Sequence, residues 1–260
     1  MTLQTYISPC PNDTFAFNAM LHGCVANYKL NFETHLYDIE ALNQAALLGQ
    51  ADIIKVSFAL WPQLKNNYDL LPVGAALGNN VGPLFISAKN IDTNKKNIKI
   101  AIPGLHTTAN FLLQFAYPHL QNKHPILFSY IETEVLNNNF DAGVIIHENR
   151  FTYANRGLQK IADLGQIWFA KTNLPIPLGG ILVKKTLPPQ IKTNIANALL
   201  ASIKYAWAQY PHLPPFVTNN AQEMSTQIMQ QHINLYVNNY TQNLGKKGLK
   251  AIALMEQIMA

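Results

Sequence analysis

One short segment places a proton-transfer side chain at the end of an apolar run. Residues 143–146 (Gly-Val-Ile-Ile) are followed directly by His147, Glu148 and Arg150. This order is typical of a buried strand whose carboxyl end opens into a ligand crevice. A histidine at that place can take or give a proton near neutral pH. We therefore expect His147 to act as a general base, with a purely structural histidine as the alternative.

The two arginines of the chain, Arg150 and Arg156, lie in the loop that follows. Arginine suits the recognition of a planar carboxylate, but it is equally suited to a local ion pair with Glu148. Neighbouring residues on an extended strand face opposite ways, so His147 and Glu148 need not act as a pair. Both interpretations of the arginines stay open at this point.

A second polar pair interrupts the apolar segment 51–57 (Ala-Asp-Ile-Ile-Lys-Val-Ser). Lys55 and Ser57 lie two residues apart and so face the same side of the predicted strand. An unpaired buried lysine is costly, which favours either an anionic substrate or a lysine that extends to water. No Gly-x-Ser-x-Gly motif surrounds Ser57, so we predict a hydrogen-bond donor and not a nucleophile.

The turn 103–108 (Pro-Gly-Leu-His-Thr-Thr) joins a predicted strand to a predicted helix. The first N–H groups of a helix lack internal partners and carry partial positive charge. With the hydroxyls of Thr107 and Thr108 beside them, they suit a carboxylate or a phosphate. Ordinary capping by threonine is the alternative. A Walker phosphate loop is excluded, because the Gly-Lys-Ser/Thr ending is absent.

Other polar residues are weaker candidates. His232 and Tyr236 share a helical face. Cys10 lies near a predicted helix start with no visible base, which favours a small buried residue. No His-x-x-x-His or Cys-x-x-Cys pair occurs, so we expect neither a metal site nor a cofactor.

The candidate residues need a scaffold in which strands and helices alternate, and the pattern predicts an open α/β sheet. Strands are predicted at 2–8, 28–37, 51–57, 70–76, 82–88, 98–102, 126–131, 140–146 and 180–184. Helices are predicted at 14–22, 39–48, 109–117, 132–136 and 191–207 and in a block from 221 to 260, with rigid loops at 163–165 and 174–180. Asp38 is expected to cap the helix at 39–48, and Asn12 or Asp13 the helix at 14–22.

The polar stretch 89–97 predicts a crossover into a second lobe. We expect a large lobe of residues 1–90 and 185–260 and a small lobe of residues 91–184. Two crossings between lobes leave a cleft, and clefts between domains are common small-molecule sites.

Composition excludes several classes of protein. Apolar residues make up 48% of the 260 residues and charged residues 13%, so a large core is expected and disorder is not. The net charge of +5 comes from dispersed lysines, which does not favour nucleic-acid binding. No apolar run reaches the ~18 residues of a membrane span, and no secretion signal is visible. With two cysteines, we expect a cytoplasmic protein with reduced thiols.

Several of these segments together resemble one enzyme family, the 1,4-dihydroxy-6-naphthoate synthases of the futalosine route to menaquinone. The similar segments occur in the same order over nearly the whole chain, and the ordered set is specific where each segment alone would be weak. They are residues 8–15, 52–57, 104–109, 145–148, 175–180 and 232–237.

The resemblance implies the two-lobed, type II fold of periplasmic binding proteins and a lyase reaction. Cyclic dehypoxanthinyl futalosine, a carboxylate, would be converted to 1,4-dihydroxy-6-naphthoate with release of dihydroxyacetone. His147 matches the family's proposed general base. The positions that match its substrate-contacting loops are Lys55, Val56 and Ser57, and Thr107 and Thr108.

Two other functions remain open from the sequence. Chorismate dehydratase of the same pathway would share the fold, but the segments 8–15 and 147–148 argue against it. A non-catalytic protein that binds a small anion, as an exported carrier or a cytosolic sensor, would bind without forming product. The sequence leaves the oligomeric state open.

Overall fold

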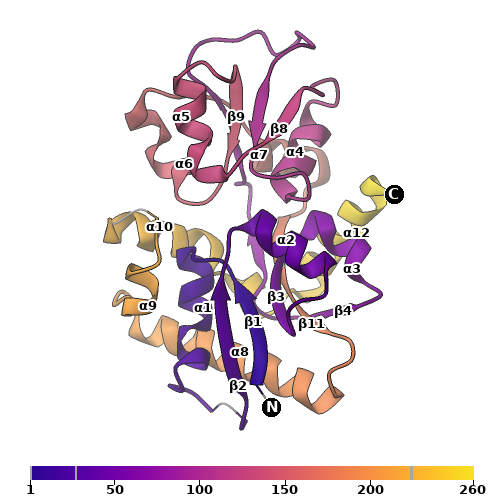
Figure 1. Ribbon diagram of the computed structural model, residues 1–260, viewed down its shortest axis with the longest axis vertical. Coiled ribbons are helices and arrows are strands. Elements are labelled where there is room, and N and C mark those ends of the chain that lie inside the picture. Colours follow the sequence, from indigo (N-terminus) through magenta and orange to yellow (C-terminus); the bar gives the residue numbers. More distant parts are fainter. Residues whose placement is uncertain (1, 27, 223–224) are drawn as a thin grey trace.

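The computed structural model describes residues 2–26, 28–222 and 225–260, and it consists of two lobes, each built on its own β-sheet. In Figure 1 the lower lobe holds both chain ends and the upper lobe is formed by the middle of the chain. This arrangement confirms the expected α/β fold with two lobes.

The sheet of the lower lobe is mixed. Its strands follow the order β2-β1-β3-β11-β4, and β5 pairs with β11. The first three strands run parallel, whereas β11 runs antiparallel to β3, β4 and β5. The strands are β1 (Thr2–Ile7), β2 (Asn31–Leu36), β3 (Ile53–Ser57), β4 (Tyr68–Leu70), β5 (Ala76–Gly78) and β11 (Ile176–Lys184).

The sheet of the upper lobe has the order β10-β6-β9-β7-β8. Here β7 runs parallel to β8 and β9, and β6 runs antiparallel to β9 and β10. The strands are β6 (Leu84–Ser87), β7 (Ile100–Ile102), β8 (Lys123–Pro125), β9 (Ala142–Ile145) and β10 (Gln159–Asp163).

Helices cover both sheets. Those of the lower lobe are α1 (Pro11–Leu21), α2 (Ile39–Leu47), α3 (Trp61–Leu64), α8 (Pro189–Gln209), α9 (Pro215–Thr218), α10 (Thr226–Tyr236), α11 (Asn239–Gln242) and α12 (Gly245–Met259). Those of the upper lobe are α4 (Thr108–Ala116), α5 (Ile131–Leu136), α6 (Asn149–Thr152) and α7 (Leu164–Thr172). Short 3-10 turns lie at Phe58–Leu60, Phe128–Tyr130 and Tyr153–Arg156. Among the described residues, no helix is long and apolar enough to cross a membrane.

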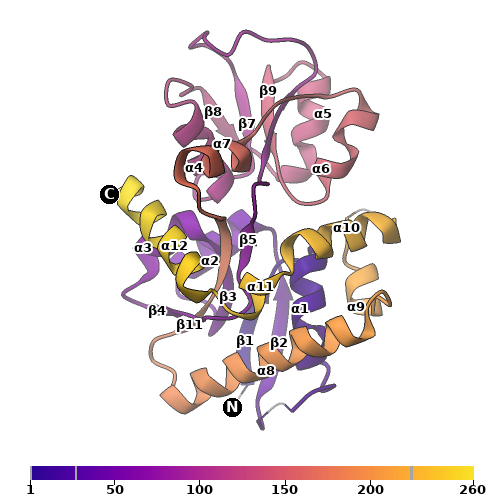
Figure 2. The ribbon, with the colours of Figure 1, turned by 180° about the vertical axis from the view of Figure 1, so that it is seen from behind.

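Sheet membership places the crossings between lobes earlier in the chain than the expected boundaries. Strand β6 (Leu84–Ser87) belongs to the upper sheet, and β11 (Ile176–Lys184) belongs to the lower sheet. Figure 2 shows β5 and β11 where the chain passes between the lobes. The polar stretch 89–97 is instead an exposed loop that follows β6. Polarity indicated exposure there. The crossings themselves are short segments, 79–83 and 173–175, in which exposed asparagines are followed by buried residues.

Local capping rules were right in part. Asp38 accepts hydrogen bonds from the backbone N–H groups of Glu40 and Ala41, as predicted for the start of α2. The prediction for α1 was wrong, because the helix begins at Pro11 with Cys10 at its N-cap. Proline at the first helical position has no N–H to satisfy, so a side-chain cap is less needed.

Four predicted elements were also wrong. The strand predicted at 70–76 is absent, because β4 ends at Leu70 and β5 begins only at Ala76. Residues 163–165 are not a loop, because Asp163 ends β10 and caps α7. Residues 176–180 are part of β11. The strand predicted at 126–131 is absent, since β8 ends at Pro125 and helical turns begin at Phe128. A short apolar run does not distinguish strand from buried helix without its neighbours. The last helical block was predicted from residue 221, whereas α10 begins at Thr226. Residues 223–224 lie outside the described residues.

An apolar cluster joins the two lobes. It includes Phe58 and Leu77 from the lower lobe, Trp168 and Leu112 from the upper lobe, and Met255 from α12. A second, larger cluster lies between the lower sheet and α1, α8 and α10. Burial of the first cluster stabilises the contact between the two lobes, because each Å² of apolar surface removed from water contributes about 25 cal/mol.

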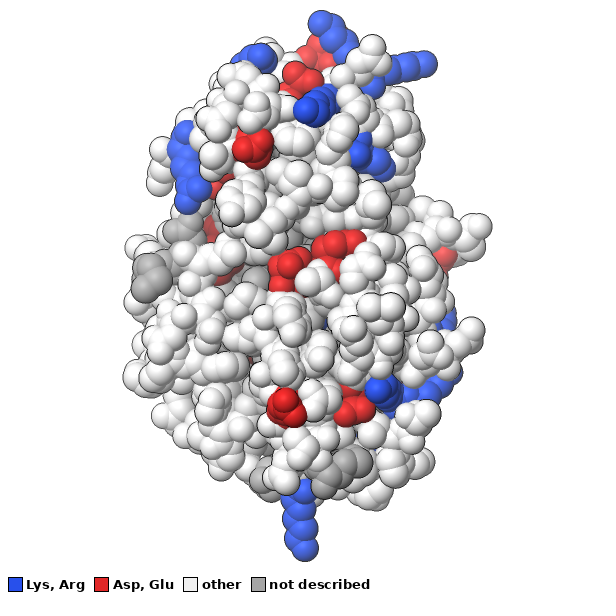
Figure 3. Space-filling view, viewed as in Figure 1, with Lys and Arg blue, Asp and Glu red and all other residues white. Residues whose placement is uncertain are grey.

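Basic side chains are dispersed over the face in Figure 3, mainly toward the ends of the molecule. No single basic stripe gathers them on that face.

Candidate active site

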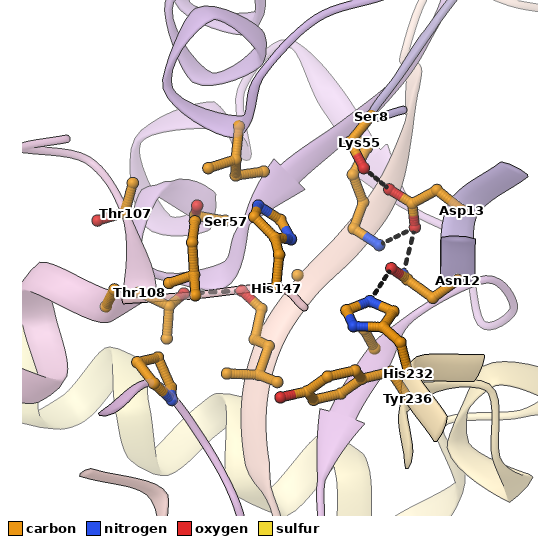
Figure 4. Close-up of a pocket in the computed structure, with 17 residues that line it drawn as sticks. Ser8, Asn12, Asp13, Lys55, Ser57, Thr107, Thr108, His147, His232 and Tyr236 are labelled. Atoms are coloured by element: carbon orange, nitrogen blue, oxygen red, sulfur yellow. Dashed lines mark hydrogen bonds and ion pairs between the residues drawn. The ribbon is translucent and has the colours of Figure 1, made fainter. Parts of the chain in front are cut away.

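A cavity of about 650 Å³, part of it open to solvent, lies between the lobes. Lower-lobe walls come from the β1–α1 turn, β3, β11 and α10, and upper-lobe walls from the turn before α4 and the end of β9. In Figure 4, Thr107, Thr108 and Ser57 lie at one side, and Asn12, Asp13, His232 and Tyr236 at the other. His147 lies between the two groups.

His147 reaches the cavity because the backbone changes direction after β9. The strand ends at Ile145, and His147 has φ 58°, in the left-handed region. That region costs a non-glycine residue roughly 1 kcal/mol or more, and histidine is among the residues that tolerate it. Strain of this kind is often retained where a side chain has a function. The ring edge also packs against Phe128, with centroids 4.8 Å apart.

Cys10 is the direct partner of His147, with its Sγ 3.0 Å from Nδ1. Burial lowers the pKa of His147 to about 4; the Asp13 carboxylate raises it by a smaller amount and the Lys55 charge lowers it further. Burial, and then the nearby Glu148 carboxylate, raise the pKa of the Cys10 thiol well above its usual value. At neutral pH the pair is therefore a thiol and a neutral imidazole, and the imidazole is able to accept a proton.

Lys55 is buried and forms an ion pair with Asp13, with Nζ 2.7 Å from Oδ1. This partner was missing from the sequence interpretation, which had considered only a substrate anion or solvent. Asp13 also accepts from Ser8 Oγ and from Asn12 Nδ2, each at 2.7 Å. The lysine charge is thus neutralised inside the protein, as a buried charge requires.

Thr107 and Thr108 both lie at the start of α4, but their hydroxyls are already engaged. Thr107 Oγ1 accepts from the Asn110 N–H and donates to the Gly104 carbonyl. Thr108 Oγ1 donates to the Leu178 carbonyl and accepts from the Ala59 N–H. Helix geometry leaves the first backbone N–H groups without intrahelical partners, and Thr108 and Ala109 line the cavity. The donors that this end offers to the cavity are therefore backbone N–H groups, and the threonine hydroxyls shape the turn that presents them.

Ser57 adds a hydroxyl to that end. Its Oγ accepts from Asn43 Nδ2 at 3.1 Å, and its N–H donates to Asn43 Oδ1 at 2.9 Å. The asparagine fixes the serine while leaving its hydroxyl proton for an acceptor in the cavity. Val56, by contrast, faces the other side of β3 and is fully buried in an apolar cluster. Its side chain does not line the cavity.

The arginines form local ion pairs. Arg150 donates to the Gly82 carbonyl at 2.6 Å and to Asp163 at 3.2 Å. Arg156 lies 2.8 Å from Glu132. These contacts tie the loop after β9 to the rest of the upper lobe, so the structural alternative accounts for both side chains.

His106 links the two lobes at the edge of the site. Its Nδ1 lies 2.7 Å from Oε1 of Glu40 on α2, and its backbone N–H donates to Oε2 of the same carboxylate. Gln44 Nε2 lies 3.1 Å from the same ring nitrogen. The residue therefore shapes the turn before α4 through a contact with the opposite lobe.

One group of side chains has the composition of a metal site. Within the described part of the chain, Cys10, His147 and Glu148 offer ligand atoms that all lie within 4.8 Å of one another. Sulfur, imidazole and carboxylate are ligands that suit zinc. Sequence spacing rules did not reveal this group, because Cys10 is far from His147 in the chain. A metal there would engage the same imidazole that we expect to act as a base.

Sequence reasoning also missed the part of the site built by α1 and α10. Asn12, Asp13, His232 and Tyr236 all line the cavity. The four-residue spacing of His232 and Tyr236 was the available signal, since both face one side of α10. Nothing in the spacing indicated that this side faces a cavity.

Comparison with known proteins agrees with this architecture. The sequence profile of a family described as "Menaquinone biosynthesis" matches residues 6–260. A 1,4-dihydroxy-6-naphthoate synthase of Streptomyces coelicolor is 39% identical over 96% of this chain and 90% of its own. One from Thermus thermophilus is 37% identical over 96% of this chain and 91% of its own.

Among solved structures, a protein from Archaeoglobus fulgidus superimposes with a TM-score of 0.91 at 29% identity, covering 99% of this chain and 97% of its own. The periplasmic aliphatic sulphonate binding protein of Escherichia coli matches with a TM-score of 0.66 at 10% identity, covering 99% and 85%. The second likeness concerns the fold alone and identifies it as that of periplasmic binding proteins. The chain belongs to the menaquinone-biosynthesis family that includes the 1,4-dihydroxy-6-naphthoate synthases.

Proposed function

We propose that this protein is a carbon–carbon lyase that converts cyclic dehypoxanthinyl futalosine to 1,4-dihydroxy-6-naphthoate and releases dihydroxyacetone. The observation that carries the proposal is the placement of His147. It is a histidine with a lowered pKa in the cleft, between an anion-binding helix start and a polar wall. The relatives named as 1,4-dihydroxy-6-naphthoate synthases support the product, and the substrate is the one that the family resemblance implies.

The substrate carboxylate binds at the start of α4. The first-turn N–H groups of Thr108 and Ala109 offer donors in a region of partial positive charge. The Ser57 hydroxyl, held by Asn43, is a third donor. Because Lys55 is neutralised by Asp13, the carboxylate is held mainly by these dipoles and not by a full charge.

His147 starts the reaction as the general base. It takes a proton from a substrate hydroxyl, the oxygen electrons form a carbonyl, and the adjacent carbon–carbon bond breaks. The electrons released on the ring side lead to an aromatic product, which favours cleavage. A positioned base contributes roughly 10²–10⁴-fold to such a step, and the remainder comes from positioning and charge stabilisation.

The contacts between lobes limit the access of water to the reacting groups. Glu40 and His106 hold the turn before α4 against α2, and the apolar cluster around Trp168 and Met255 packs the lobes together nearby. Exclusion of water by the bound substrate strengthens the hydrogen bonds to the carboxylate and protects reactive intermediates.

The test is to incubate the purified protein with cyclic dehypoxanthinyl futalosine and to follow 1,4-dihydroxy-6-naphthoate and dihydroxyacetone by chromatography and mass spectrometry. We expect both products in equal amounts, and their loss in a His147→Ala variant. Binding without turnover by the unmodified protein would indicate a small-anion binding protein instead. Turnover of chorismate, but not of the futalosine derivative, would indicate a chorismate dehydratase.

A further inference from the structure

His232 lies at the side of the cavity opposite the start of α4 (Figure 4). It comes from α10, is 1% exposed and lines the cavity together with Tyr236, one helical turn further on. Its ring centroid is 6.4 Å from that of His147. The proposed base thus has a second imidazole beside it that the mechanism above does not use.

A chain of hydrogen bonds determines which nitrogen of His232 carries the proton. The Asp13 carboxylate, paired with Lys55, accepts from Asn12 Nδ2. A carboxylate only accepts, so the Asn12 amide must present its nitrogen to Asp13. Its oxygen therefore faces Nε2 of His232, at 2.9 Å. An amide oxygen also only accepts, so Nε2 carries the hydrogen and donates it.

The other ring nitrogen is then a bare acceptor. Burial, together with the nearby positive charge of Arg150 and Lys55 and the ring of His147, lowers the pKa of His232 well below its usual value, so the ring is neutral. A neutral imidazole with hydrogen on Nε2 has an unprotonated Nδ1. This Nδ1 is buried and has no hydrogen-bond partner among the described residues. Buried polar atoms are rarely left so, because the lost bond to water is uncompensated.

We infer that His232 Nδ1 accepts a hydrogen bond from a substrate hydroxyl, and that this contact selects ligands with a hydroxylated fragment at the α10 side of the cavity. The identity of the ligand rests on the proposed function. The carboxylate end of the substrate lies at α4, and its sugar-derived hydroxyls face the part of the cavity wall that His147 and His232 line. Asn12 is the positioning residue, because it fixes the tautomer that makes Nδ1 an acceptor.

Two variants separate this contact from the structural role of the ring. His232→Gln retains an amide donor near the Nε2 position for Asn12 but removes the acceptor at the Nδ1 position. His232→Asn retains an acceptor near the Nδ1 position but is too short to reach Asn12. Two ligands complete the comparison: cyclic dehypoxanthinyl futalosine, and naphthalene-2-carboxylate, which has the carboxylate and rings but no hydroxyl.

For His232→Gln we expect kcat/KM for the futalosine derivative to fall roughly 10-fold to 100-fold, as for a lost hydrogen bond that leaves a buried group unpaired. Inhibition by naphthalene-2-carboxylate should change less than about twofold, because that ligand donates nothing to His232. His232→Asn should lose less activity than His232→Gln. In the unmodified, 15N-labelled protein, NMR should assign the hydrogen of His232 to Nε2.

Several results would overturn the inference. One is a hydrogen on Nδ1 in the NMR spectrum. Another is a folded His232→Gln variant in which kcat/KM for the futalosine derivative and inhibition by naphthalene-2-carboxylate fall equally. That result would mean that the ring has only a structural role in the cavity wall. If the unmodified protein binds naphthalene-2-carboxylate but neither binds nor converts the futalosine derivative, the proposed function fails and the inference with it. If the unmodified protein converts the futalosine derivative but the His232 variants do not behave as expected, only the role of His232 is overturned.

Discussion

The Sγ atom of Cys10 lies 3.0 Å from Nδ1 of His147, although the two residues are 137 positions apart in the chain. The contact joins the start of α1 in the lower lobe to the end of β9 in the upper lobe. It also bears on catalysis, because Nδ1 and Nε2 of a neutral imidazole have opposite roles. In the proposed mechanism His147 acts as a base through Nε2, with its Nδ1–H directed at the sulfur.

The first prediction concerns His147 itself. His147→Ala should lower kcat by roughly 10²–10⁴-fold, because proton abstraction loses its base. The dissociation constant for the substrate should change only a few-fold, since the proposed binding mode holds the carboxylate at α4. Steady-state kinetics and calorimetric binding to the slow variant measure the two quantities. An unchanged kcat would exclude His147 as the base.

The second prediction concerns pH. Burial lowers the pKa of His147 to about 4, so the folded protein keeps this ring neutral where a free histidine would be protonated. The acid limb of the kcat/KM profile should therefore fall near pH 4 and not near the ordinary histidine pKa of about 6.5.

The same shift affects folding. The unfolded chain takes up a proton on this histidine below about pH 6.5, whereas the folded protein does so only near pH 4. The contribution of His147 to the free energy of unfolding should be constant above about pH 6.5, and the free energy of unfolding should decrease as the pH drops from about 6.5 toward 4. His232, whose pKa is also lowered, adds to the slope. Urea unfolding at several pH values measures it, and a His147→Gln variant with the same slope would refute the contribution of His147.

The third prediction concerns Cys10. Cys10→Ala should lower kcat by roughly fivefold to tenfold, the effect of one hydrogen bond that orients the ring. Cys10→Ser retains a group that donates and accepts, so it should retain more activity. The KM should change little in both variants, because Cys10 does not line the cavity. A KM effect without a kcat effect would show that the sulfur does not position the base.

The fourth prediction concerns the buried ion pair of Lys55 and Asp13. Asp13→Asn should destabilise the fold by about 3–5 kcal/mol, because it leaves the lysine charge buried without its partner. The double variant Asp13→Asn with Lys55→Met removes both charges and should regain a large part of that loss. Urea denaturation of the two variants checks this. An equal loss in both would mean that the charges are not coupled.

The fifth prediction concerns the contact of Glu40 with His106. Glu40→Gln should weaken the contact between lobes by less than ~1 kcal/mol, as expected for a partly exposed ion pair. The KM should then rise less than about fivefold, with kcat unchanged. Gly104→Ala should have a larger effect, since its added methyl group would collide with the Glu40 side chain. Equal effects of the two variants would argue against this steric account.

Local rules were sufficient for the candidate residues that lie at element ends. Thr107 caps α4 as its position predicts, Asp38 caps α2, and His147 lies just beyond a buried strand. The alternation of β3 likewise predicted that Lys55 and Ser57 share a face, and both line the cavity. Periodicity and capping depend on residues within one or two turns, so the sequence alone carries that information.

The partners of these residues were decided by the tertiary structure. Asp13 meets Lys55 across 42 positions, and Asn12 meets His232 across 220. A hydrophobic pattern tells which side of an element is buried, but not which distant element packs against it. Tertiary packing around one cavity therefore decided three features that local rules did not predict. They are the position of the lobe crossings, the contact of His147 with Cys10 and, within the described part of the chain, the unpaired Nδ1 of His232.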